Sequence, residues 1–252
     1  MGIERVVASP GSRSTALITA AATTPGIALD IQHDERVAAF VALGYGKGAQ
    51  RPAVLICTSG SAGSHYLPAV LEGHYSGVPI MMLTADRPAE LQGVGAPQTV
   101  DQSGFFSGYT RLTRLLPDID VLGDGDMIDL ARETYTAAVV GRGPVHVNWQ
   151  FPEPLEPGNL RQGQQGAAES SHTRQPMAYS AIGLQPAQAN AIGSADQLAF
   201  RHLLQVRRGF IVVGPDDHPP DARQLIFDFA RNRGWPVFAD IGSGLRTGGP
   251  PK

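Results

Sequence analysis

Residues 27–44 read IALDIQHDERVAAFVALG and set a pattern that recurs along the chain. An apolar run, Ile27 to Ile31, gives way to a short polar segment and then to apolar residues at helical spacing. This order predicts a strand followed by a helix, with Asp34 as the N-cap of that helix. Glu35 then lies in the first helical turn, where it either only complements the helix dipole or faces a ligand, because ligands bind at this edge of open α/β sheets.

The same alternation of apolar runs and helical segments extends over the first 150 residues or so. We expect strands at 5–8, 27–32, 53–58, 79–84, 111–116 and 144–149. We expect helices at 14–22, 35–48 and 127–140, and a further helix that follows the turn at 59–63 and ends near residue 76. Near-continuous apolar strands alternating with helices are typical of a parallel sheet covered on both faces, so the predicted fold class is α/β. Right-handed crossovers place the carboxyl ends of all strands at one edge. The polar loops 9–13, 33–35, 58–61 and 86–87 should therefore gather there.

Composition excludes several classes of protein. The 252 residues carry a formal net charge of −3 without a basic tract, which argues against a nucleic-acid partner. The single cysteine, Cys57, lies in an apolar run and is expected to be a buried thiol, and one cysteine excludes an internal disulfide framework. No apolar segment approaches the roughly 18 residues of a membrane span, and the start shows no signal-peptide pattern. We therefore expect a cytoplasmic protein without a membrane span.

Composition also suggests how the chain is divided. We expect a first domain over residues 1–157, and a linker over 158–193 because that stretch is rich in Gln, Gly, Ala, Ser and Pro. A second α/β unit over 194–252 holds only two predicted strands, too few for a complete domain core. The chain also begins and ends close to predicted strands, so we expect it to be part of a longer protein.

Some local motifs could carry chemistry. Ser9 to Ser14 reads Ser-Pro-Gly-Ser-Arg-Ser, which combines a glycine turn, hydroxyls and a guanidinium at a strand–helix junction and suits a carboxylate or phosphate. The alternative is a plain turn with Ser14 as N-cap. Gly123 to Asp126 resembles a magnesium-binding Gly-Asp-Gly, but Asp126 can cap the next helix and no paired asparagines follow, so we reject a metal site there. The long aperiodic stretch 89–108 is of a kind that is usually functional.

Together, several motifs carry a family resemblance. They are Ser-Pro-Gly-Ser-Arg-Ser at 9–14, Asp-Glu-Arg at 34–36, Thr-Ser-Gly-Ser-Ala at 58–62, Pro-Ala-Val at 68–70, Thr-Ala-Asp-Arg-Pro-Ala-Glu-Leu at 84–91 and Gly-Ala-Pro-Gln-Thr at 95–99. In this order and spacing they resemble the thiamine-diphosphate-dependent 2-succinyl-5-enolpyruvyl-6-hydroxy-3-cyclohexene-1-carboxylate synthases of menaquinone biosynthesis. The resemblance is strong over residues 3–157 and weaker over 194–246.

The resemblance implies a domain order. The pyrimidine-binding domain comes first, a central domain follows, of which 194–252 would be a part, and a diphosphate-binding domain comes third and is absent here. It also implies the cofactor thiamine diphosphate with Mg²⁺ or Mn²⁺. The ligands of the metal and of the diphosphate are expected on the absent domain, so no metal ligand is assigned in this chain.

The resemblance further assigns roles to residues. Glu35 would be the catalytic carboxylate that binds and activates the cofactor, while Ser12, Arg13, Arg87 and Gln98 would bind substrate. For Arg87 the structural alternative is an ion pair with Asp86 or Glu90. The implied reaction is that of a transferase, which decarboxylates 2-oxoglutarate and adds the succinyl carbanion to isochorismate. The implied assembly is a homodimer or tetramer in which a second subunit completes the site.

Two other interpretations stay open at this point. One is another thiamine-diphosphate enzyme, a 2-oxoacid decarboxylase or acetolactate-synthase relative, which would share the activating glutamate but not the remaining motifs. The other is a truncated chain that folds or pairs but does not catalyse.

Overall fold

The structure is a computed structural model that describes residues 2–116, 123–155, 193–216 and 218–246. The pattern of internal contacts divides the chain into two compact units, Met1–Ile182 and Gly183–Lys252. Each unit is described by itself. The predicted boundaries at 157 and 193 remain a prediction, because almost all of the expected linker lies outside the described residues. Within the described ranges, no helix is both long enough and apolar enough to cross a bilayer.

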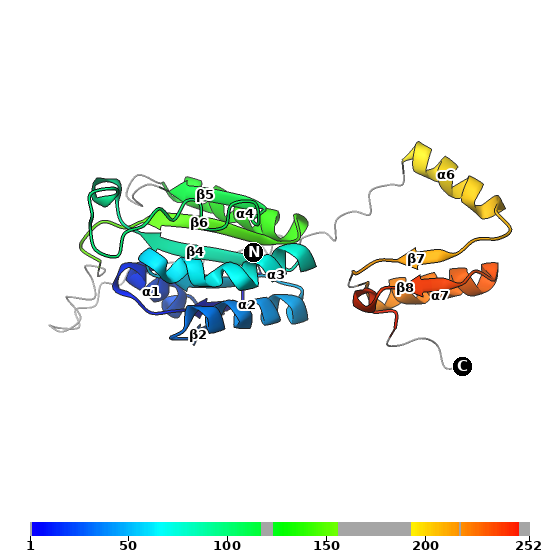
Figure 1. Ribbon diagram of the computed structural model, residues 1–252, viewed down its shortest axis with the longest axis horizontal. Helices are drawn as coiled ribbons and strands as arrows, with labels where there is room; N and C mark the ends of the chain where they lie inside the picture. Colours follow the sequence, from blue (N-terminus) through cyan, green and yellow to red (C-terminus); the bar gives the residue numbers. More distant parts are fainter. Residues whose placement is uncertain (1, 117–122, 156–192, 217, 247–252) are drawn as a thin grey trace, which may run out of the picture. The chain divides into compact units, whose positions relative to one another are not determined.

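The elements of the first unit follow the predicted alternation closely (Figure 1). Its strands are β1 (Arg5–Ala8), β2 (Ala28–Ile31), β3 (Ala53–Cys57), β4 (Ile80–Asp86), β5 (Leu112–Leu116) and β6 (Pro144–Gln150). Its α-helices are α1 (Thr15–Thr23), α2 (Glu35–Ala49), α3 (Leu67–Ser76) and α4 (Asp124–Val140), and its short 3₁₀ turns are η1 (Ser12–Ser14), η2 (Gly60–Tyr66) and η3 (Ala89–Leu91).

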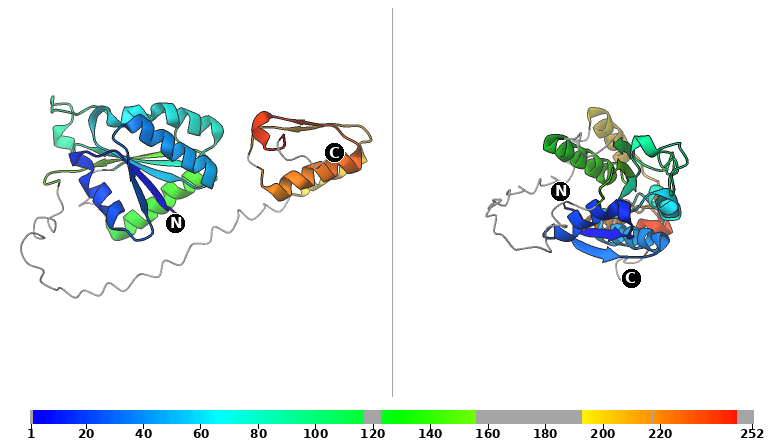
Figure 2. Two further views of the ribbon diagram at one scale, coloured as in Figure 1. Left: turned by 90° about the horizontal axis from the view of Figure 1, so that it is seen from below. Right: turned by 90° about the vertical axis from the view of Figure 1, so that its left-hand side faces the viewer.

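The six strands form one parallel sheet in the order β2-β1-β3-β4-β6-β5. The predicted α/β class with a parallel sheet is thereby confirmed. The carboxyl ends of all the strands lie along one edge, as Figure 2 lets the reader follow. The chain leaves β1 toward β2 on one side and then returns to place β3 on the other side. Open α/β sheets bind ligands at the carboxyl ends of the strands where the strand order reverses, which here are the ends of β1 and β3.

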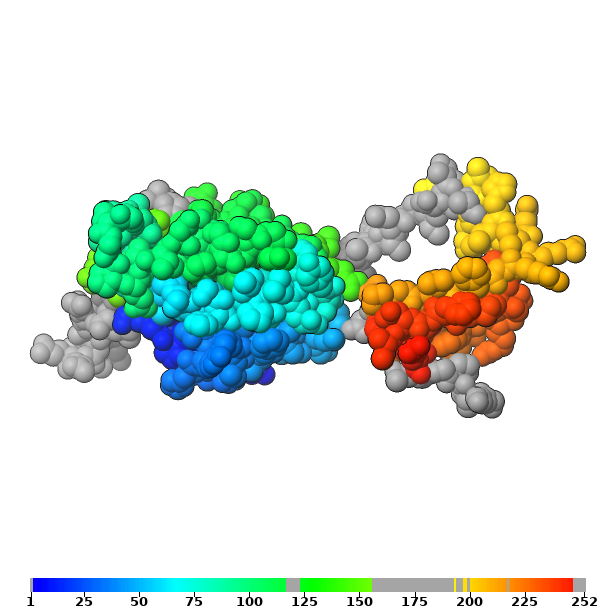
Figure 3. Space-filling model, viewed as in Figure 1, coloured from blue at the N-terminus to red at the C-terminus, as the bar shows by residue number. Residues whose placement is uncertain are grey.

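Two helical layers bury the sheet because its strands are apolar on both faces. On one face, α2 and α3 pack against strand residues that include Val7, Leu55 and Met82. On the other face, α1 and α4 pack against residues that include Val6 and Ile56. Figure 3 shows α2 and α3 at the surface of the first face. Every residue of β3 is buried, so this strand lies at the centre of the core.

Most predicted boundaries differ from the observed ones by one or two residues, and the start of α4 differs by more. Helix α4 begins at Asp124 rather than near Met127, because Gly123 takes the N-cap position. The carboxylate of Asp126 then accepts a hydrogen bond of 3.1 Å from the Gly123 N–H. Asp126 therefore closes the start of the helix from inside its first turn, and the Gly-Asp-Gly sequence is a helix start.

The second unit contains α6 (Ser194–Gln205), β7 (Ile211–Val213), α7 (Pro220–Arg233), β8 (Val237–Ala239) and the 3₁₀ turn η5 (Ile241–Ser243). Strands β7 and β8 form a two-stranded parallel sheet. Its apolar side chains are poorly covered: Phe210 is 64% exposed, Val212 68% and Phe238 60%. In the described part of this unit, β7 and β8 pair only with each other, and a two-stranded sheet is too small to bury these side chains.

Candidate functional site

The start of α2 presents a carboxylate at the edge of the sheet. Asp34 is the N-cap, as predicted, and its Oδ1 accepts a 2.9 Å hydrogen bond from the N–H of Arg36. The Arg36 guanidinium donates two hydrogen bonds to the Asp34 carboxylate, the shorter of them 2.6 Å long. These hydrogen bonds are the main reason why the pKa of Asp34 lies well below its usual range. Glu35 is half-buried, and among the described residues no group donates a hydrogen bond to its carboxylate. Asp34 therefore caps the helix, and Glu35 is left available.

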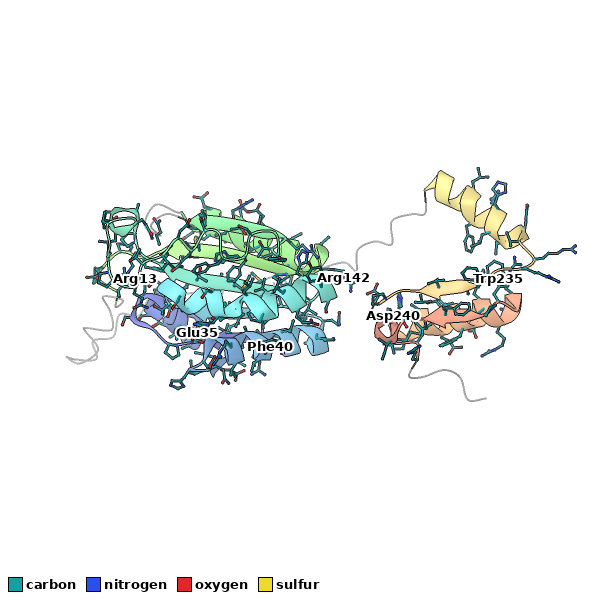
Figure 4. All side chains as sticks on the ribbon, viewed as in Figure 1. Arg13, Glu35, Phe40, Arg142, Trp235 and Asp240 are labelled. Atoms are coloured by element: carbon teal, nitrogen blue, oxygen red, sulfur yellow. The ribbon has the colours of Figure 1, made fainter. Side chains whose placement is uncertain are left out.

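An apolar pocket lies on the outer side of α2, on the face of the helix opposite Glu35. Its volume is about 530 Å³, and it is lined by Asp34, Arg36, Val37, Phe40 and Val41. Phe40 is 50% exposed and Val37 48%, although both are large apolar residues. Figure 4 shows Glu35 and Phe40 on this helix. Glu35 instead lies toward the buried side chains of Cys57 and Tyr66, because its charge contributes to the raised pKa of both groups.

Arg13 lies in η1, shortly after the carboxyl end of β1, and is only 6% exposed. Its Nη1 donates a 2.5 Å hydrogen bond to the carbonyl of Phe151, and its Nη2 lies 3.5 Å from the Glu153 carboxylate. The hydroxyl of Ser14 donates to the carbonyl of Gly11 and does not cap α1, which disfavours the plain N-cap interpretation of this loop. Ser12 is exposed beside Arg13.

Glycine is required at position 11 of this loop. A Cβ on Gly11 would lie 2.4 Å from the Cβ of Thr58, which follows β3. The loops after β1 and β3 can therefore touch only through a residue without a side chain. This close approach is what brings Arg13 toward the loop that contains Ser59.

Arg87 follows β4, and its guanidinium donates to the hydroxyl of Ser59. Asp86 accepts from the backbone N–H of Arg87 at 2.7 Å, so its carboxylate orients the Arg87 backbone. Burial lowers the pKa of Arg87, and the nearby positive charge of Arg13 lowers it further. The two guanidinium groups therefore lie close enough to interact at the same edge.

Gln98 reaches the same loop from the long segment that follows β4. Its Nε2 donates a 3.0 Å hydrogen bond to the carbonyl of Ser59. A Cβ on Gly60 would lie 2.7 Å from the Cγ of Gln98, and Gly60 has a φ of +81°. Glycine at position 60 thus serves both the turn and the approach of Gln98.

A buried polar network behind these loops is absent from the sequence-based assignments. Gln102 is 1% exposed, and its Oε1 accepts a 2.8 Å hydrogen bond from the N–H of Gly60. Its Nε2 donates to Asn148 Oδ1 at 2.7 Å, and Asn148 Nδ2 donates to Asp86 Oδ2 at 2.7 Å. The network therefore ties the turn at Gly60 to the carboxyl end of β4 through β6.

The network continues into the sheet. The hydroxyl of Thr84 donates to Asn148 Oδ1 at 2.6 Å, so it must accept from His146 Nε2 at 2.8 Å. Burial lowers the pKa of His146 to about 4, which keeps its imidazole neutral with the proton on Nε2. Strand β6 signals this in sequence, because His146, Asn148 and Gln150 alternate with apolar residues, a period that places them on one sheet face.

Cys57 is fully buried, as predicted, and burial raises the pKa of its thiol to about 12. A thiol with this pKa is not a nucleophile at neutral pH. Among the described residues, no group of three or more His, Cys, Asp or Glu side chains could hold a metal ion.

The sheet thus gathers most of the predicted site residues at one edge. Arg13 and Arg87 interact, Gln98 and Arg87 share Ser59 as a partner, and Ser12 lies next to Arg13. Glu35 follows β2, which pairs with β1 along the same edge. Figure 4 shows Arg13 and Glu35 at one end of the first unit and Arg142 at the opposite end.

Comparison with known proteins agrees with the resemblance read from the motifs. Residues 1–105 match the family described as thiamine pyrophosphate enzyme, N-terminal TPP binding domain. Proteins named 2-succinyl-5-enolpyruvyl-6-hydroxy-3-cyclohexene-1-carboxylate synthase are similar over 98% of the chain, at 40% identity in Chloroflexus aurantiacus, 42% in Geobacillus kaustophilus and 34% in Listeria innocua. The chain spans only 40% to 42% of the length of these relatives.

Proposed function

We propose that this chain is the N-terminal portion of a thiamine-diphosphate-dependent 2-succinyl-5-enolpyruvyl-6-hydroxy-3-cyclohexene-1-carboxylate synthase, a transferase that decarboxylates 2-oxoglutarate and transfers the succinyl group to isochorismate. The observation that carries the proposal is the half-buried carboxylate of Glu35 at the start of α2, which accepts no hydrogen bond from the described residues. The similarity of nearly the whole chain to synthases of that name supports it.

The surroundings of Glu35 fit the aminopyrimidine half of thiamine diphosphate. Because no described group donates a hydrogen bond to this carboxylate, it can accept one from a ring nitrogen or share its proton. When bound, thiamine diphosphate supplies the electron sink for the decarboxylation. The role of Glu35 is to hold and move a proton at the pyrimidine ring, a form of acid–base catalysis.

The other loops supply positive charge for carboxylates. Arg13 and Arg87 interact at the carboxyl edge of the sheet, and both substrates of the proposed reaction carry carboxylates. Guanidinium groups bind carboxylates through paired N–H donors, which gives both affinity and orientation. Ser12 and Gln98 contribute a hydroxyl and an amide beside them. We assign these residues to substrate binding.

We further propose that this chain holds only half of a site. The ligands for the diphosphate and for Mg²⁺ or Mn²⁺ would come from the remaining part of a full-length synthase. The exposed apolar face of α2, formed by Val37, Phe40 and Val41, favours a homodimer or tetramer in which a second subunit covers that face. We propose a cytoplasmic location for the assembly.

Weak cofactor binding by the isolated chain is the first expected result. Without groups for the diphosphate and the metal, the 252-residue chain should bind thiamine diphosphate with Mg²⁺ far more weakly than a full-length relative does. Isothermal titration calorimetry of both proteins under the same conditions measures the difference. Tight one-to-one binding by the isolated chain would contradict the half-site proposal.

Arg87→Ala tests the assignment of substrate binding. It is best made in a fusion of this chain to the remainder of the Geobacillus kaustophilus relative, because that fusion restores the missing part. Loss of a charged hydrogen-bond donor should lower kcat/KM for 2-oxoglutarate about 10- to 100-fold while leaving the Kd for thiamine diphosphate nearly unchanged. Arg114→Ala, which removes a surface arginine paired with Glu133, is the matched control. An equal loss of substrate and cofactor binding in Arg87→Ala would refute the assignment.

A further inference from the structure

One side of the Arg13 guanidinium is hydrogen-bonded, and the other side makes only one long contact. Its Nη1 is bound to the Phe151 carbonyl. The opposite face, formed by Nε–H and Nη2–H, is the fork that binds a carboxylate through two parallel hydrogen bonds. Among the residues that the structure describes, the buried Nε of Arg13 has no hydrogen-bond partner, and Nη2 has only the Glu153 carboxylate at 3.5 Å. A buried donor without an acceptor destabilises the protein, so this face is incomplete as it stands.

Glu153 is a poor partner for that fork. A charge-assisted hydrogen bond between a guanidinium and a carboxylate is normally about 2.7–2.9 Å long, well below the 3.5 Å found here. The Glu153 side chain is 74% exposed, while that of Arg13 is 6% exposed. Glu153 therefore keeps most of its hydration and loses little on leaving, whereas Arg13 is fixed in place by burial and by Phe151.

The local charge favours an exchange of one carboxylate for another. Arg13 and Arg87 interact with each other, and Glu153 is the exposed anion near both of them. If Glu153 leaves without replacement, the two guanidinium groups lose a neutralising neighbour. A carboxylate that arrives in its place restores that charge and can also reach the idle Nε–H.

We propose that Glu153 is an internal placeholder, a carboxylate of the chain itself that occupies the Arg13 fork until a substrate carboxylate displaces it. This inference rests on the proposed function, since it takes the incoming ligand to be a carboxylate substrate such as 2-oxoglutarate. Glu153 thereby competes with the substrate and weakens its binding, and it screens the paired arginines while the site is empty.

The test uses the full 252-residue chain, labelled with ¹⁵N and titrated with 2-oxoglutarate while the Nε–Hε signal of Arg13 is followed by NMR. An Arg13→Gln variant identifies that signal by its loss. Glu153→Gln and Glu153→Ala should each bind 2-oxoglutarate about three-fold more tightly than the parent chain, because the competing ion pair is gone. Glu90→Gln removes the same charge from an exposed residue of η3 and should change the affinity much less.

Several results would overturn the placeholder. Unchanged or weaker binding in both Glu153 variants would make Glu153 a support for Arg13 rather than its competitor. An equal gain in Glu90→Gln would reduce the effect to net charge. Absence of any 2-oxoglutarate effect on the Arg13 signal would also overturn it. The Arg87→Ala kinetics in the fusion separate the failure of this inference from the failure of the proposed function. If Arg87→Ala lowers kcat/KM for 2-oxoglutarate specifically, but the Glu153 variants bind 2-oxoglutarate no more tightly, the placeholder role is rejected and the proposed function stands.

Discussion

Glu35→Gln, in the fusion to the remainder of the Geobacillus kaustophilus relative, is expected to lower the rate of 2-oxoglutarate decarboxylation about 10²- to 10⁴-fold. The substitution keeps the size of the side chain and its capacity to accept a hydrogen bond, but it removes the group that can hold and release a proton. Glu35 has no other partner among the described residues, so the loss of its charge should leave the fold intact. Release of carbon dioxide under saturating cofactor measures the effect.

The control for this variant is Glu72→Gln, the same substitution at an exposed position of α3. It should leave the rate unchanged. Calorimetry of thiamine diphosphate binding to Glu35→Gln supplies a readout that does not depend on turnover, and a modest rise in Kd is expected from one weakened hydrogen bond. Decarboxylation by Glu35→Gln at the rate of the parent fusion would refute the proposed role of Glu35.

Gln102→Met is expected to give the largest loss of stability among substitutions near the site. Methionine has the same length as glutamine and fills the same space, but it leaves the buried N–H of Gly60 without an acceptor and removes the donor to Asn148. Each buried polar group left unpaired costs about 1–3 kcal/mol, so the free energy of unfolding should fall by roughly 2–4 kcal/mol. Urea denaturation of the chain, followed by circular dichroism, measures the change.

Gln98→Met is the matched control, because Gln98 is exposed and makes one hydrogen bond, to the carbonyl of Ser59. Its effect on the free energy of unfolding should stay below about 1 kcal/mol. If both variants lost the same stability, the buried network would contribute no more than a surface contact does. A stable Gln102→Met with wild-type denaturation would show that Gly60 finds another acceptor when Gln102 is removed.

Local pattern accounts for most of the fold. Strand β3 is recognisable because all of its residues are apolar, and α2 because Asp34 caps apolar residues at helical spacing. Boundaries were less certain where polar and glycine residues meet. At α4 the sequence placed the start near Met127, whereas a glycine N-cap and the side chain of Asp126 begin the helix at Asp124. The hydrogen bond between Gly123 and Asp126 fixes the start of this helix, and the spacing of apolar residues does not predict that hydrogen bond.

The hydrogen-bond and ion-pair partners of the site residues cannot be predicted from the sequence. The sequence leaves an ion pair of Arg87 with Asp86 or Glu90 open, whereas in the structure its guanidinium contacts Ser59, 28 positions earlier in the chain. The sequence predicts that Arg13 binds substrate. In the structure its guanidinium contacts Phe151 and Glu153, which lie far from Arg13 in the sequence. These contacts depend on which strand lies next to which.

The sequence by itself determined the alternation of strands and helices, the buried thiol, the cap at Asp34 and the edge of the sheet at which the polar loops meet. These features depend on the periodicity and chemistry of residues that are close in the chain, so they can be read locally. Only the tertiary structure decided the strand order, the network that runs from Asp86 through Asn148 to Gln102, and the pairing of Arg13 with Glu153. The physical reason is that such pairs join residues far apart in sequence, and their geometry exists only once the sheet has assembled.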